Sequence, residues 1–120
     1  MAFSKKDWMD AADAAIYAIV REPMLDLAKA VRAVRRKVKG KKREELEHCV
    51  VLLAAVRDRV ATLARSPEMT APGVVRGLYA SLDDIDYQRC LSVLMKEFPE
   101  VPREALGRIQ MESIHWYYLR

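Results

Sequence analysis

The stretch that decides the fold is KREELEHCVVLLAAVRDRVATLAR, residues 42–65, which contains neither glycine nor proline. Two rows of apolar side chains recur in it at heptad spacing, one made of Leu46, Leu53 and Val60 and the other of Cys49, Val56 and Leu63. Acidic residues gather at its start and basic residues towards its end, which suits the helix dipole. The pattern predicts a long central helix whose apolar seam packs inside a helical bundle or, alternatively, against a second copy of the chain in a homodimer.

Shorter helices are predicted before this segment. Ser4 and Asp7 have the spacing of a capping box, so a first helix is expected to start there and to end before Pro23. A second helix is expected to carry Pro23 in its first turn and to stop at Gly40, because glycine readily adopts the left-handed conformation of a helix end. Residues 1–65 would then form a three-helix unit.

A smaller helical unit is predicted over residues 70–120. Thr70 is expected to cap a short helix with Pro72 in its first turn, and Ser81 with Asp84 repeats the capping-box spacing at the start of another. A last helix is expected after Pro102. The chain therefore has the pattern of an all-α, compact bundle of about five to six helices.

Length and composition favour a single domain over residues 1–120. The chain is 52% hydrophobic and holds only four glycines and five prolines, few for a sandwich or a barrel. Cys49 and Cys90 stand alone and are expected to be core residues in a reducing compartment. No apolar run approaches the roughly 20 residues of a membrane helix, so we expect a cytoplasmic protein that does not insert into a membrane.

Positive charge is concentrated in one part of a chain whose net charge is +4. The basic segment, as we call it, consists of Lys29, Arg32, Arg35, Arg36, Lys37, Lys39, Lys41, Lys42 and Arg43. No acidic residue interrupts it, so it repels itself unless something negative lies nearby. Three interpretations are open: a solvated helix face, a contact surface for nucleic-acid phosphates, or one for an acidic protein surface or membrane headgroups.

The C-terminal third offers a second way to bind nucleic acid. Residues 92–110 have the outline of a helix-turn-helix, although a plain helical corner fits the same pattern. In the first interpretation the side chains offered to base edges would be Arg103, Glu104, Arg108 and Gln110. Trp116 and Tyr117, near the end of the last helix, are expected to be core residues or an apolar anchor at an interface.

A metal site is the low-probability alternative that would make the protein an enzyme. Glu45 with His48, and Glu112 with His115, both have the Glu-x-x-His spacing that lets one helix face offer a carboxylate and an imidazole to one ion. Geometry argues against the site, because the first pair falls at a helix start and the second close to the last residue of the sequence. We therefore expect no metal and no cofactor.

The function expected from the sequence is binding without catalysis. The leading hypothesis is a small regulatory or adaptor protein that binds another macromolecule, in the first place a protein, through the basic segment and the aromatic last helix. The alternative is a nucleic-acid-binding regulator that uses the basic segment with or without residues 92–110.

Overall fold

The computed structural model describes residues 3–22, 24–73 and 84–119, with side chains as far as Trp116. Its described part contains five α-helices: α1 (Lys5–Ala15), α2 (Leu27–Lys37), α3 (Arg43–Ala64), α4 (Tyr87–Glu97) and α5 (Arg103–Leu119). A π-helix, η1 (Ile16–Val20), continues α1, and a 3-10 turn, η2 (Pro67–Met69), follows α3. The prediction of an all-α helical bundle is confirmed.

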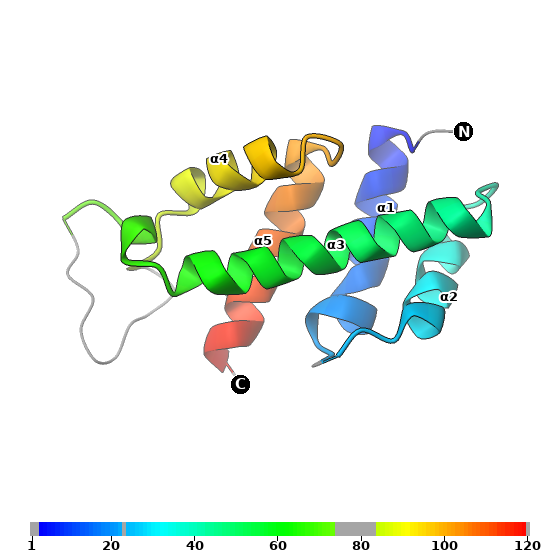
Figure 1. Cartoon of the computed structure of the whole chain (residues 1–120), viewed down its shortest axis with the longest axis horizontal. Coiled ribbons are helices and arrows are strands. Elements are labelled where there is room, and N and C mark those ends of the chain that lie inside the picture. The colour runs from blue at the N-terminus through cyan, green and yellow to red at the C-terminus, as the bar shows by residue number, and fades with distance from the viewer. Residues whose placement is uncertain (1–2, 23, 74–83, 120) are drawn as a thin grey trace.

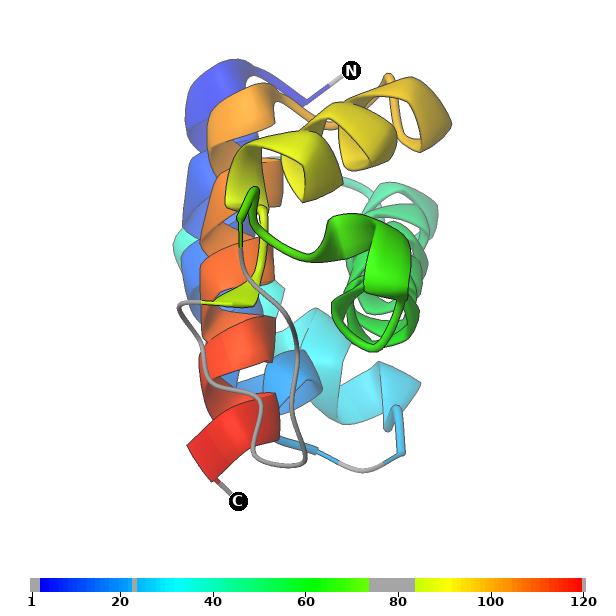
Figure 2. The ribbon, with the colours of Figure 1, turned by 90° about the vertical axis from the view of Figure 1, so that its left-hand side faces the viewer.

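The helices lie in two layers. Helices α1 and α5 stand side by side in one layer, and α3 crosses in front of both (Figure 1). In the view turned by 90° α3 lies on the opposite side of the molecule from α5 and α1, while α4 closes the top (Figure 2). Helix α2 returns alongside α1 and also packs on α3. One continuous apolar core runs between the layers, so the two units expected from the sequence share it.

Helix α3 supplies the centre of this core, as its heptad pattern predicts. All six seam residues are at most 5% exposed: Leu46, Cys49, Leu53, Val56, Val60 and Leu63. They are covered by the other helices of the same chain, chiefly α5 and α2. Within this chain the seam therefore packs inside the bundle, the first of the two alternatives, and a homodimer through residues 42–65 stays a prediction.

The first two helices show where local signals hold and where they fail. The capping box at Ser4 is present, with its hydroxyl accepting from Asp7 N and Asp7 Oδ2 accepting from Ser4 N. Gly40 has the left-handed φ of 75° expected of it, but α2 already ends at Lys37 with Val38 as its extended C-cap, so the predicted helix stop at Gly40 was wrong. The start of α2 at Pro23 was wrong, because α2 begins at Leu27 and its N-cap is Asp26, which accepts from Lys29 N at 3.1 Å.

The predicted helices around residues 70–84 also need correction. Thr70 caps no helix: it forms an antiparallel bridge with Ile85, and Ala71 N donates to Asp84 O at 2.7 Å. Helix α4 starts at Tyr87 behind the cap Asp86, which accepts from Arg89 N, because the bridge to Thr70 holds Ile85 outside the helix. The remainder of the expected short helix, and the predicted cap Ser81, lie outside the described residues.

Candidate functional site

Helix α2 separates its apolar residues from its cations. Its buried residues are Ala30, Val31 and Val34, which face α1 and α3. Four cations of α2 and one just after its end are exposed, and we call these five the unpaired cations: Arg32, Arg35, Arg36, Lys37 and Lys39. Across the described ranges none of these five forms a hydrogen bond or an ion pair with a carboxylate. The structure thus leaves an exposed cationic surface without internal neutralisation.

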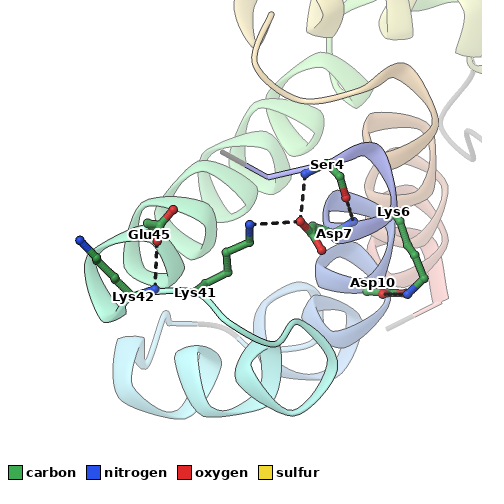
Figure 3. Close-up of polar contacts among 7 residues, drawn as sticks. All are labelled: Ser4, Lys6, Asp7, Asp10, Lys41, Lys42 and Glu45. Atoms are coloured by element: carbon green, nitrogen blue, oxygen red, sulfur yellow. Dashed lines mark hydrogen bonds and ion pairs between the residues drawn. The ribbon is translucent and has the colours of Figure 1, made fainter. Parts of the chain in front are cut away.

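Of the four remaining members of the basic segment, Lys42 is also exposed, and within the described ranges its ammonium pairs with no carboxylate, whereas the other three have carboxylate partners. The Lys41 side chain is only 6% exposed, and its ammonium lies 3.3 Å from Asp7 Oδ2 and 5.3 Å from the Phe3 ring centroid. Figure 3 shows Lys41 pointing back to the first turn of α1, while the Lys42 side chain points away. Lys41 therefore fastens the loop before α3 to α1, which corrects its expected place on the binding surface.

Two further members have carboxylate partners at the surface. Lys29 Nζ lies 2.6 Å from Glu22 Oε1, and Arg43 Nε lies 2.8 Å from Glu47 Oε1. Exposed pairs of this kind contribute little stability and open readily. Both cations remain near the surface but carry a local counter-charge.

A groove of about 760 Å³ lies between α1–η1 and α2. Its apolar lining consists of small residues, Ala14 and Ala18 from one side and Ala33 from the other, together with Tyr17. The Tyr17 side chain is 68% exposed although it is aromatic. An exposed aromatic ring beside small apolar residues in a concave surface is typical of a binding site.

Charged side chains border this groove unequally. Its cations are Lys29, Arg32, Arg36 and Lys37, and its carboxylates are Asp13 and Glu22. Both carboxylates already have partners: Asp13 Oδ1 is 3.1 Å from Arg108 Nε, and Glu22 pairs with Lys29. Three cations of the groove are left without a counter-charge, so its electrostatic character is positive.

The π-helix gives the α1 side of the groove its shape. Tyr17 and Ala18 belong to η1, and π-helical turns occur frequently at functional sites. Arg57 of α3 stabilises the end of η1 by donating from Nη1 to Ile19 O at 2.7 Å. Arg21 then stacks its guanidinium on Tyr17, 4.6 Å from the ring centroid. These contacts hold one face of the Tyr17 ring in place.

Trp116, an expected anchor, lies next to this arrangement. Its ring is half-buried against the core and lies 5.3 Å from the Arg21 guanidinium. The side chain of Tyr117, its expected companion, lies outside the described residues. Sequence reasoning missed Tyr17 as a site residue. The available signal was the alanine-rich first helix, whose small side chains allow a neighbour to approach closely.

Two of the four side chains expected to read bases in residues 92–110 form ion pairs with α1. Glu104 pairs with Lys5 at 3.0 Å and Arg108 with Asp13, so both are held by ion pairs to α1. Gln110 is only 3% exposed and lies in the core, which corrects its proposed contact with bases. Of the four residues, Arg103 is exposed at the first turn of α5.

The two Glu-x-x-His motifs have different surroundings from those expected for a metal site. Glu45 Oε1 accepts from Lys42 N at 3.0 Å, and this hydrogen bond from the backbone lowers the pKa of the carboxyl. His48 Nε2 lies 2.9 Å from Glu100 Oε1. Among the residues described, Glu112 and His115 included, no group of three or more histidine, cysteine or acidic side chains could hold a metal ion.

Neither cysteine has the character of a nucleophile. Both side chains are buried, and no disulfide joins them. Burial raises the pKa of the Cys49 thiol to about 12, with a smaller contribution from the charge of Glu100, and burial likewise raises the pKa of Cys90 to about 11. Both thiols are protonated at neutral pH, as expected of core residues.

Comparisons with protein-family models, curated proteins and solved structures gave no match to this chain. Among the described helices, none combines the length with the apolar composition that crossing a bilayer requires. The geometry and charge of the chain's own residues are therefore the basis for assigning a function.

Proposed function

We propose that the chain is a small, non-enzymatic regulatory or adaptor protein that binds an acidic region of another protein through the exposed cations of α2. The observation that carries this proposal is the set of five unpaired cations, of which Arg32, Arg35, Arg36 and Lys37 lie on α2, opposite its buried face, and Lys39 lies two residues after it. Such a set raises the electrostatic energy of the folded chain, and an acidic partner relieves it. The same charges accelerate encounter with that partner.

The groove beside the cations favours protein over nucleic acid. Phosphates of a duplex are bound by cations and polar donors and gain nothing from the alanines and the Tyr17 face that line the groove, whereas only the unpaired bases of a single strand can stack on an aromatic ring. Protein interfaces combine aromatic and arginine side chains around an apolar centre, as Tyr17 and Arg36 do here.

Affinity capture with a charge-reversed variant tests the proposal. The tagged Arg32→Glu/Arg35→Glu protein is compared with wild type in an extract of the source cells, with and without nuclease. The matched control is Arg89→Glu/Lys96→Glu, which changes the net charge equally at exposed positions of α4. We expect specific protein partners that survive nuclease, disappear with the α2 variant and remain with the α4 variant.

Two outcomes would contradict the proposal. Partners that remain bound to the α2 variant would show that these cations are a solvated surface. Capture that disappears after nuclease would instead favour the nucleic-acid alternative, and a steep salt dependence, with about −0.7 to −0.9 in log-log slope per phosphate contact, would support it.

A further inference from the structure

The groove between α1–η1 and α2 lies beside the unpaired cations but is a narrower and more selective feature than they are. We infer that the groove binds an acidic amphipathic helix of the partner. Carboxylates of that helix pair with Arg32 and Arg36, and one of its apolar side chains packs against Tyr17. This inference rests on the proposed function, because it specifies the partner's chemistry at the same surface.

The spacing of the cations suits a helical occupant. Arg32 and Arg36 both border the groove and are four residues apart in α2, so they lie about 6 Å apart along its axis. Two carboxylates four residues apart on a second helix have the same separation of about 6 Å. A helix lying along α2 therefore pairs both arginines without distortion of either backbone.

The small side chains of the groove also suit a helix. Ala14 and Ala18 are four residues apart on one side, and Ala33 lies on the other, so the apolar lining of the groove, Tyr17 apart, consists of small side chains. Small residues at a helix interface allow the axes to approach to the lower end of the usual 8–10 Å. A third helix can thus rest in the groove as it would in a three-helix bundle.

Tyr17 provides the apolar contact. Arg21 covers one face of its ring, and the side chain remains 68% exposed. A leucine or phenylalanine on the occupant, one turn from the carboxylates, would cover this exposed area. Anchors of this kind, spaced at i, i+3, i+4 and i+7, are the usual means by which an amphipathic helix binds in a groove.

The probes for the test are two synthetic peptides of equal composition, built from Glu, Leu and Ala. Each is about 18 residues long, because shorter isolated helices are marginal in water. In the first, leucines and glutamates form one helical face; in the second, the same residues are scrambled. A single-stranded oligothymidylate serves as the phosphate probe. Binding is measured by fluorescence anisotropy of labelled probes, and the site by amide shifts in nitrogen-15 NMR spectra.

We expect the amphipathic peptide to bind about tenfold more tightly than the scrambled one, which corresponds to one well-formed helical contact face. The largest amide shifts should fall on α1, η1 and α2. Equal binding of the two peptides would overturn the groove inference and leave the proposed function intact, because charge alone would then explain the affinity. Tighter binding of the oligothymidylate would contradict both.

Two pairs of variants locate the contact. Arg36 lines the groove and its neighbour Arg35 does not, although both are exposed. Arg36→Glu should weaken binding of the amphipathic peptide by about tenfold. Arg35→Glu should weaken it by about threefold or less, since an exposed charge outside the groove acts only through screened attraction. Equal losses would place the peptide outside the groove.

The apolar pair is Tyr17→Ala with Met24→Ala. Both side chains are highly exposed, 68% and 81%, so neither change should disturb the fold, and only Tyr17 lines the groove. Tyr17→Ala should lower the protein's affinity for the amphipathic peptide by about fivefold, and Met24→Ala should leave this affinity unchanged. An unaltered affinity of Tyr17→Ala, or failure of wild-type protein to bind the amphipathic peptide at all, would overturn the inference.

Discussion

Replacing the buried Gln110 by methionine should make the protein more stable. Gln110 is 3% exposed, and its Oε1 atom has no hydrogen-bond partner in the described part of the chain. A buried acceptor that loses water without gaining a partner costs about 1–3 kcal/mol. Methionine has the same unbranched shape and a similar helix propensity. The free energies of packing and of helix formation are therefore nearly the same in the variant as in the wild type. We expect the free energy of unfolding to rise by about 1–2 kcal/mol.

Urea unfolding followed by circular dichroism at 222 nm measures this change. With a urea m-value of about 2 kcal/mol per molar, within the range of a small domain, the midpoint should rise by about 0.5–1 M. The matched control is Gln88→Met on α4, where the side chain is exposed and the same replacement should leave the midpoint unchanged. A lower midpoint for Gln110→Met would refute the reasoning, because it would show that the amide makes a stabilising hydrogen bond.

Three other predictions concern charge, packing and thiol reactivity. The hydrogen bond from Ser4 N and, to a lesser extent, Lys41 hold the pKa of Asp7 below its usual value, so Asp7→Asn should lose about 1–2 kcal/mol of stability at pH 7. That loss should begin to shrink below about pH 4, the pKa of an aspartate in the unfolded chain, and vanish once the pH falls below the lowered pKa of native Asp7; a pH-independent difference in urea midpoints would contradict it. Leu53→Ala, at a fully buried position of α3, should cost about 2–5 kcal/mol in thermal or urea unfolding, whereas Val51→Ala on its exposed face should change stability by less than about 0.5 kcal/mol. Cys49 and Cys90 should not react with Ellman's reagent at pH 8 until urea unfolds the chain, and rapid labelling of the native protein would show that one of them is accessible.

Features that depend on neighbours in the sequence were predicted well. The heptad rows of residues 42–65 predicted α3 within one residue at each end and identified its buried seam. The capping box at Ser4 and the left-handed Gly40 were also predicted. Each of these depends on side chains within one or two helical turns, so periodicity and spacing are sufficient evidence. The starts of α2 and α4 were missed because the aspartate N-caps at Asp26 and Asp86 compete with proline and capping-box signals nearby.

The site itself was only partly predictable. Sequence located the cations but could not separate Lys41, which is buried against Asp7, from Arg36, which is exposed. It also placed Gln110 on a surface, whereas that side chain lies in the core.

By itself the sequence determined that the chain is helical, where its longest helix runs and which of its faces is apolar, because these follow from local periodicity. Only the tertiary structure decided which charges remain unpaired and that Tyr17 and Ala33, far apart in the sequence, border one groove. The reason is that the environment of a charged or aromatic side chain is set by partners on other helices, and the packing of α1 against α2 brings those partners together.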